Sequence, residues 1–241
     1  MRVALFVTCL VDVFFPDVAK SVVRVLRRYG VEVEVPRTQT CCGQPAYNSG
    51  YRAEAREVAK QLIRALEGST YVVTPSGSCA AMIRCEYPRL FADDPEWHPR
   101  AEALAAKTYE FSEFIVNVLG VEDPGVTFPA RATVHTSCHM TRGLGVQEEP
   151  LTLLKRVEGL ELCPLPNRED CCGFGGTFAV KMADISAAMA DEKIDHIEET
   201  DAEVLIGSDM GCLWHLGGRL SRRGKRLRVL HVAQVLDGGR E

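Results

Sequence analysis

Eight of the ten cysteines in this chain fall into two sets with the same layout. In each set one cysteine precedes an adjacent cysteine pair followed by glycine, and a fourth cysteine comes later. The first set is Cys9, Cys41, Cys42 and Cys79, and the second is Cys138, Cys171, Cys172 and Cys212. Clustered thiolates are soft donors that bind iron–sulfur clusters or zinc. The pattern predicts metal chemistry at two four-thiol sites.

The offset between the two sets is nearly constant along the chain. It is 129 residues at the first cysteine, 130 at the pair and 133 at the last cysteine. Such self-similarity indicates an internal duplication. We therefore expect two tandem cysteine-rich repeats, residues 1–122 and 130–241, related by a pseudo-twofold axis.

The adjacent cysteine pair bears on the kind of metal centre. Successive side chains tend to point apart, which suits one ion poorly, whereas a multi-iron cluster offers several separate ligand positions. Gly43 and Gly173 follow the pairs and permit unusual backbone angles and close approach to a bulky cofactor. All eight cysteines of the sets are thus expected as ligands of iron–sulfur clusters, with a [4Fe–4S] type favoured. Zinc in one site and reduced redox or structural thiols remain alternatives.

The second half carries polar residues around Cys138 that the first half lacks. The stretch 135–142 reads HTSCHMTR, whereas residues 8–11 around Cys9 read TCLV. One interpretation makes His139 a proton donor or extra ligand and Arg142 an anion contact for a carboxylate, both with catalytic roles. The other makes them a hydrogen-bonded histidine at a helix start and a surface arginine.

Strand and helix patterns alternate in both halves. In the first we expect strands at 3–8, 31–35 and 71–74 and helices at 17–29 and 53–67. In the second we expect strands at 132–137, 160–165 and 204–207 and one long helix at 180–199. Alternation of this kind predicts an α/β fold in which each repeat is a parallel sheet flanked by helices.

Every cysteine of both sets follows an expected strand and precedes an expected helix. Such positions meet outside the carboxyl ends of parallel strands, where open α/β sheets bind ligands. Helix N-termini there offer free N–H groups and positive dipole ends, which stabilise thiolates. We expect two such crevices facing each other near the pseudo-symmetry axis.

Composition and charge indicate which partners and which cell compartment to expect. The chain has 241 residues, 46% of them apolar, and a net charge of −5, which argues against nucleic acid as a partner. No apolar run approaches the roughly 18 residues of a transmembrane helix. The apolar N-terminus is interrupted by Asp12 and is better interpreted as a buried strand than as a signal peptide. We therefore expect a cytoplasmic protein, where thiols stay reduced.

The cysteine motifs resemble those of a known superfamily. Duplicated Cys-Cys-Gly pairs with flanking cysteines are similar to the cysteine-rich CCG domains found in the B subunit of heterodisulfide reductase and in the glycolate oxidase iron–sulfur subunit. Within it, the chain most resembles the lactate utilization protein A family, through residues 6–12 (FVTCLVD), 40–50 (TCCGQPAYNSG), 75–79 (PSGSC), 135–142 (HTSCHMTR) and 171–178 (CCGFGGTF).

This resemblance implies a cytosolic component of an iron–sulfur system that oxidises L-lactate, a 2-hydroxy acid. It also implies two partner proteins, an iron–sulfur protein B and a protein C. The wider superfamily often ends each set with two cysteines, but here Ser76 and Asp209 stand at the first of those positions. Four thiols per set suffice for a cubane cluster or a zinc site, and Asp209 could add an oxygen ligand.

Three functional hypotheses follow. In the first, the chain is a subunit of an iron–sulfur oxidoreductase complex of the L-lactate dehydrogenase type and carries electrons through its clusters. In the second, it is a thiol–disulfide reductase similar to heterodisulfide reductase. In the third, it is a non-catalytic, zinc-stapled assembly subunit. The stretch 173–176 (GFGG) does not match the GxGxxG nucleotide fingerprint, so hydride chemistry would need another cofactor or a partner.

Overall fold

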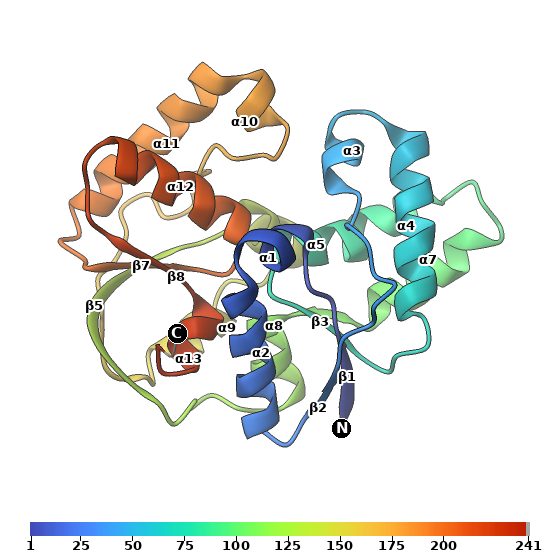
Figure 1. Cartoon of the computed structure of the whole chain (residues 1–241), viewed down its shortest axis with the longest axis horizontal. Helices are drawn as coiled ribbons and strands as arrows, with labels where there is room; N and C mark the ends of the chain where they lie inside the picture. Colours follow the sequence, from blue (N-terminus) through green and yellow to red (C-terminus); the bar gives the residue numbers. More distant parts are fainter. Residues whose placement is uncertain (240–241) are drawn as a thin grey trace.

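The computed structural model describes residues 1–239 and contains two four-stranded sheets in which every strand pair is parallel. The strands are β1 (Arg2–Leu5), β2 (Glu32–Glu34), β3 (Val72–Thr74), β4 (Thr108–Glu110), β5 (Thr127–His135), β6 (Glu158–Leu162), β7 (Val204–Gly207) and β8 (Arg228–His231). The strand order is β2-β1-β3-β4 in the first sheet and β6-β5-β7-β8 in the second. The two orders are the same, as a duplication requires (Figure 1). The expected α/β fold of two parallel-sheet repeats is confirmed.

Helices connect the strands in both halves, and three π-helical segments are labelled η. The first half contains α1 (Cys9–Phe14), α2 (Pro16–Arg28), α3 (Gln44–Asn48), α4 (Arg52–Leu66), α5 (Gly77–Ala81), η1 (Met82–Glu86), α6 (Tyr87–Leu90), α7 (Trp97–Ala106), α8 (Phe111–Glu113) and η2 (Phe114–Val118). The second contains η3 (His139–Leu144), α9 (Glu149–Leu154), α10 (Phe178–Lys181), α11 (Ala183–Glu198), α12 (Met210–Arg222) and α13 (Val232–Leu236).

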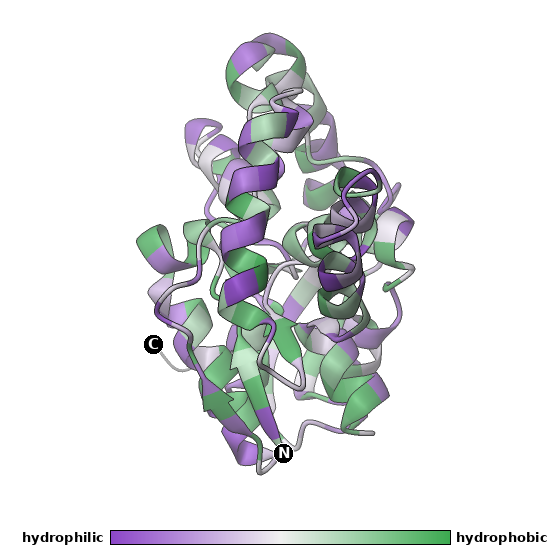
Figure 2. Ribbon diagram, turned by 90° about the vertical axis from the view of Figure 1, so that its right-hand side faces the viewer, coloured by the Kyte–Doolittle hydropathy of each residue, from purple (hydrophilic) through white to green (hydrophobic). Residues whose placement is uncertain are grey.

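Local sequence explains the main helices. Helix α2 starts with Pro16, whose missing N–H costs nothing in a first turn. Its buried residues recur at helical spacing and include Val18, Val22 and Leu26. Helix α4 buries Ala55, Ala59, Leu62, Ile63 and Leu66 in the same way. Figure 2 shows hydrophilic residues on the outward faces of such helices.

One expected helix is wrong in part. The single helix predicted over 180–199 is two helices, α10 and α11, divided at Met182. Met182 has φ −127° and ψ 51°, outside the helical region. The apolar residues on both sides suggested continuity, but Val180, Met182 and Ile185 are exposed, so no core holds them in one helix. Among residues 1–239 no helix has the length and apolar character needed to span a bilayer.

One of the three hydrophobic clusters of the protein spans both halves. Helix α2 of the first half packs against α13 of the second, and α9 of the second half packs against α8 and η2 of the first (Figure 1). The two contacts are equivalent, because α9 corresponds to α2 and the segment α8–η2 corresponds to α13. This exchange is what a pseudo-twofold axis produces. The shared cluster includes Leu5, Val22, Leu26, Phe111 and Phe114 of the first half and Leu153, Leu154, Ile206, Val232 and Leu236 of the second. An ion pair crosses the same boundary, because Arg24 Nε donates to Asp237 Oδ2 at 2.6 Å.

Candidate metal centre

The four single cysteines lie where strands give way to helices. Cys9 is the first residue of α1, after β1, and Cys79 lies in α5, after β3. Cys138 directly precedes η3, after β5, and Cys212 lies in the first turn of α12, after β7. These positions are the carboxyl ends of neighbouring parallel strands, which brings residues distant in sequence together. In Figure 1, α1, α5 and α12 meet near the centre of the molecule.

The two cysteine pairs lie in loops just before short helices. Cys41 and Cys42 follow β2 and precede α3, and Cys171 and Cys172 follow β6 and precede α10. Each pair is tied to its own sheet half by core contacts. The Tyr87 hydroxyl donates to the Cys42 carbonyl at 2.8 Å, with Tyr87 fully buried. The loop is therefore held by its backbone, and the sulfurs remain available for a ligand.

In the first set the sulfurs form an outer and an inner couple. Cys9 Sγ lies 3.8 Å from Cys41 Sγ, and Cys42 Sγ lies 3.4 Å from Cys79 Sγ. Cys9 is exposed, whereas Cys42 and Cys79 are buried. The set thus runs from solvent into the protein.

The second set repeats this layout. Its outer couple is Cys138 and Cys171, whose Sγ atoms are 4.0 Å apart. Its inner couple is Cys172 and Cys212, both buried, with the two sulfurs less than 4.8 Å apart. The agreement between the halves shows that the duplication preserved the positions of the sulfurs as well as the fold.

All eight cysteines line one cavity of about 210 Å³ between the two halves. Two facing crevices were expected from the sequence, and in the structure the two sites face each other across one common cavity. The reason is the close approach of the two sheets at their carboxyl ends, where Ser76 and Asp209 pair as an antiparallel bridge. Any two centres held here would lie side by side within one protein.

Asp209 links the halves at this bridge. Its Oδ2 accepts hydrogen bonds from the Ser76 hydroxyl at 3.1 Å and the Ser78 N–H at 2.9 Å, and its Oδ1 accepts from the Gly211 N–H at 3.0 Å. Ser76 caps α5 and Asp209 caps α12, so one carboxylate serves two helix starts. Both oxygens accept hydrogen bonds, which gives Asp209 a linking role; it also lines the cavity, so the oxygen-ligand role considered from sequence stays a prediction.

Gly43 and Gly173 direct their backbone N–H groups at the sulfur two residues earlier. Gly43 N lies 3.4 Å from Cys41 Sγ, and Gly173 N lies 3.4 Å from Cys171 Sγ. Their φ angles of +82° and +84° belong to the left-handed region, which glycine enters at little cost. Each glycine therefore lets the loop turn back so that an amide donates to its own cysteine.

The thiols of each set differ in pKa, and in the second set hydrogen bonding with Cys172 lowers the pKa of Cys212 to about 7. Hydrogen bonds from Cys42 and then Cys9 lower the pKa of Cys41 to about 3. Hydrogen bonds from Cys138 and then Cys172 lower the pKa of Cys171 to about 2. The same couplings raise the pKa of the partner thiols Cys9, Cys42, Cys138 and Cys172. The thiolate is the metal-binding form of cysteine, so each set presents a ready first ligand.

The four sulfurs of the first set are not gathered around a single point. An ion with metal–sulfur bonds of about 2.3 Å holds its tetrahedral sulfurs about 3.8 Å apart in every pair. Within residues 1–239, no three ligand atoms of the first set lie within 4.8 Å of one another. The sulfurs stand instead in two close couples, Cys9 with Cys41 and Cys42 with Cys79, and this clustering suggests metal or cluster binding.

His139 and Arg142 occupy different places. His139 lines the cavity, with Nδ1 3.7 Å from Cys138 Sγ. Arg142 points elsewhere, since its guanidinium donates to the Glu169 carbonyl at 2.9 Å and it is not part of the cavity wall. The two residues predicted together as catalytic are therefore separated, and Arg142 supports a loop.

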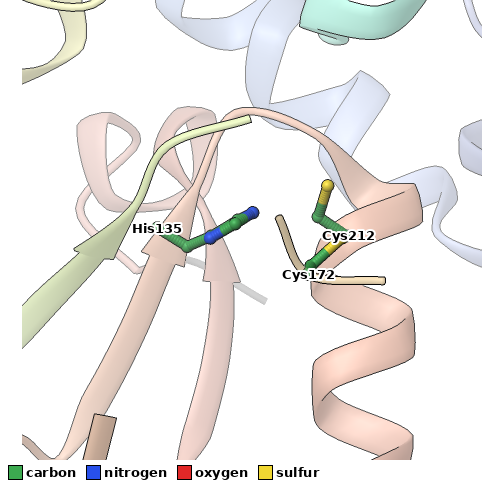
Figure 3. A group of neighbouring side chains, drawn as sticks. All are labelled: His135, Cys172 and Cys212. Carbon is green, nitrogen blue, oxygen red and sulfur yellow. The ribbon is translucent and has the colours of Figure 1, made fainter. Parts of the chain in front are cut away.

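His135 was quoted in the sequence motif but received no role there. It ends β5, is 3% exposed, and its two ring nitrogens have no hydrogen-bond partner. Figure 3 shows its ring pointing from the strand toward Cys172 and Cys212. The signal that could have found it is the 129-residue offset, which aligns His135 with Phe6.

The comparisons with known proteins agree with these motifs. A family model described as CCG, a cysteine-rich domain, matches residues 3–84 and again 132–217. Lactate utilization protein A of Geobacillus thermodenitrificans (strain NG80-2) is 61% identical over 98% of this chain and 99% of its own length. This chain belongs to the lactate utilization protein A family. The family member of Bacillus subtilis (strain 168) is 58% identical over the same shares.

The similarity to solved structures supports the fold only. A hypothetical protein from Helicobacter pylori superimposes with a TM-score of 0.63 at 13% identity. The match covers 100% of this chain and 49% of that protein, so the family fold spans about half of the longer chain.

Proposed function

We propose that this chain is the iron–sulfur component of an L-lactate oxidation system and carries electrons through clusters held by its two cysteine sets. The observation that carries the proposal is the convergence of all eight set cysteines on one cavity. Its second support is 61% identity to a protein named for lactate utilization. A role in lactate utilization is the coarser part of this proposal, and iron–sulfur chemistry is its finer part.

The chemistry required is electron transfer. Conversion of L-lactate to pyruvate releases two electrons and two protons, and iron–sulfur clusters accept electrons one at a time. Two centres in one cavity would match this two-electron donor. The two protons would be released where lactate is oxidised, and we assign that site to the complex and not to this chain alone.

The residues of each half have distinct parts in this proposal. The inner sulfurs of Cys42, Cys79, Cys172 and Cys212 are buried and would hold the centre away from water. The outer sulfurs face the cavity and would complete the ligand set. The amides of Gly43 and Gly173 would donate to the ligand sulfurs and stabilise their negative charge.

The proposal includes partners and a compartment. The chain would act in the cytoplasm as a subunit of an oxidoreductase complex with two further lactate-utilization proteins, the iron–sulfur protein B and protein C. Substrate would reach the complex as a small 2-hydroxy acid. His139, on the cavity wall beside Cys138, would be a proton donor to the centres.

Metal analysis tests the finer proposal. The full chain, purified without oxygen, is expected to contain iron and acid-labile sulfide, and each of Cys42→Ser and Cys172→Ser is expected to lose about half of the iron. Cys85→Ser is the matched control, because Cys85 lies outside the sets and its thiol faces the Gly143 carbonyl. Unchanged iron in both set variants would refute the ligand assignment.

One observation favours a second candidate, thiol–disulfide reduction. The inner sulfurs of Cys42 and Cys79 lie 3.4 Å apart and the outer sulfurs of Cys9 and Cys41 lie 3.8 Å apart, so thiols stand in close couples. Activity of the reconstituted complex with disulfides and none with L-lactate would select this candidate. Zinc without iron or sulfide would instead select the non-catalytic, zinc-stapled assembly subunit.

A further inference from the structure

The two halves differ at one buried position next to the inner cysteines. Leu5 of β1 pairs with Val73, which places Phe6 level with Thr74. In the second half His135 of β5 pairs with Gly207, the counterpart of Thr74 at the end of the matching strand. Phe6 is fully buried and packs in the cluster that contains Cys42 and Cys79. His135 therefore occupies the place of Phe6 in an otherwise repeated site.

The environment of His135 lacks what a core histidine needs. Buried polar groups are almost always hydrogen-bonded, because an unpaired one loses its hydration without compensation. His135 is 3% exposed, yet neither Nδ1 nor Nε2 has a partner. If the side chain only filled space, phenylalanine would do so without burying unpaired polar atoms, as Phe6 does in the first half.

The missing partner lies on the cysteine side. One ring nitrogen of His135, Cys172 Sγ and Cys212 Sγ all fall within 4.8 Å of one another, and all three residues are buried. Figure 3 shows the imidazole and the two thiols converging from β5, the pair loop and the start of α12. Two thiolates and one imidazole are a common ligand set for zinc-type ions, with bonds of about 2.3 Å to sulfur and about 2.0 Å to nitrogen.

We propose that His135 is a metal ligand, so that the second half binds its metal through mixed nitrogen and sulfur coordination while the first half uses sulfur only. The proposal rests on the proposed function in one respect, that the second set holds a metal. The metal can be an iron of a cluster or a single zinc-type ion, since imidazole suits both. The two halves are then unequal sites in one cavity.

Cobalt binding tests the ligand assignment. The experiment uses the full chain with Cys42→Ser and Cys79→Ser, which removes the inner sulfurs of the first half, stripped of metal and titrated with Co²⁺ without oxygen. His135→Phe copies the residue of the first half and so is the substitution most compatible with the fold. We expect it to raise the Kd for Co²⁺ by at least about 10-fold, since loss of a group that merely orients a ligand already costs ~10–100-fold.

The spectrum separates ligation from packing. The Co²⁺ d–d band of any remaining complex is expected to shift when the imidazole is lost, and a structural role would leave it in place. His98→Phe is the control, because His98 lies on α7 and contacts the Pro88 carbonyl. Equal Kd and equal band position in the His135→Phe protein would overturn the proposal.

A second arm identifies the metal. In the reduced, anaerobically purified wild-type chain, pulsed EPR coupling to an imidazole nitrogen that disappears in His135→Phe assigns the ligand to iron. Its absence alongside a positive cobalt result assigns a zinc-type ion. Failure of the two proposals is distinguishable, because protein without iron or sulfide refutes the iron–sulfur function, and an unchanged cobalt titration refutes the role of His135.

Discussion

The four sulfurs of each set are chemically different although their residue type is the same. Cys41 and Cys171 receive hydrogen bonds from neighbouring thiols and from a glycine amide, which lowers their pKa to about 3 and about 2. The inner sulfurs are buried, and hydrogen bonding with Cys41 and Cys79, together with that burial, raises the pKa of Cys42. A metal would thus meet one anionic sulfur first and displace protons from the others as it binds.

Replacement of Gly173 by alanine is expected to disturb the second site more than Gly43→Ala disturbs the first. A Cβ on residue 173 would lie 2.6 Å from the Ser186 carbonyl oxygen, whereas on residue 43 the nearest atom would be 3.4 Å away. Both variants also carry the left-handed penalty of about 1–2 kcal/mol. Urea unfolding should therefore give a larger loss for Gly173→Ala. Equal losses would show that the loop around residue 173 relaxes freely.

At the scale of elements, the site is built from helix starts. Caps supplied by Ser76 and Asp209 begin α5 and α12, and the hydrogen bonds between them join the sheets. The first turns of these helices carry Cys79 and Cys212, so a displaced cap would displace a ligand.

Asp209→Ala is expected to destabilise the fold by about 1–3 kcal/mol. It removes the α12 cap and leaves the buried Ser76 hydroxyl and Ser78 N–H without their acceptor. Asp17→Ala in the exposed first turn of α2 is the control and should cost much less. The measurement is the free energy of unfolding in urea. A loss no larger than that of the control would contradict the linking role.

His231 gives α13 an acid-sensitive start. Its Nδ1 accepts a hydrogen bond from the Ala233 N–H at 3.1 Å, and full burial lowers its pKa from 6.5 to about 4. The unfolded chain therefore binds a proton before the folded chain does, and stability falls as the pH drops from about 6.5 to about 4.

His231→Asn should remove this sensitivity, because asparagine caps helices without titrating. Between about pH 7 and pH 4.5 the metal-free wild-type protein should lose about 2–3 kcal/mol more than the variant, from a pKa difference worth about 1.4 kcal/mol per unit. Urea midpoints of both proteins at the two pH values measure it. Parallel losses would mean that His231 titrates normally.

Local sequence signals explain what could be predicted about the elements. The apolar run that forms β7 and the periodic helices α2 and α4 matched their predicted positions closely, since each carries its own pattern and stop signal. The break at Met182 was not predicted, because the residues on both sides favour a helix and the sequence does not show that this segment lacks core contacts. The proposed role of His135 was not predicted either. A histidine at the end of an apolar strand points to a metal site only once the fold has placed the Cys172 and Cys212 thiols beside it.

The whole molecule depends on contacts that no local pattern encodes. Positions of the cysteines along the chain predicted two sites, but the single cavity follows from how the halves pack across α2, α13, α9 and η2. The contacts between α2 and α13 join residues more than two hundred positions apart, such as Arg24 and Asp237. The duplication and its pseudo-twofold arrangement were therefore readable from sequence, and the helix contacts that hold the two copies together were not.

The shared core predicts that neither repeat folds alone. A chain of residues 1–122 would expose Phe111 and Phe114, and one of 130–241 would expose Leu153 and Leu236, all now fully buried in the common cluster. Burial of such side chains is worth about 1.5–3 kcal/mol each, so each fragment would lose much of a typical domain's stability.

Expressed separately, the two fragments should give no cooperative urea transition, whereas coexpression should yield a one-to-one complex that melts cooperatively. Because the cavity wall comes from both halves, only the complex should retain metal after desalting without oxygen. Coexpressed fragments carrying Arg24→Ala should associate more weakly, since the buried carboxylate of Asp237 would lose its closest cation. A lone repeat that unfolds cooperatively and keeps its metal would show that the boundary between residues 122 and 130 divides two independent domains.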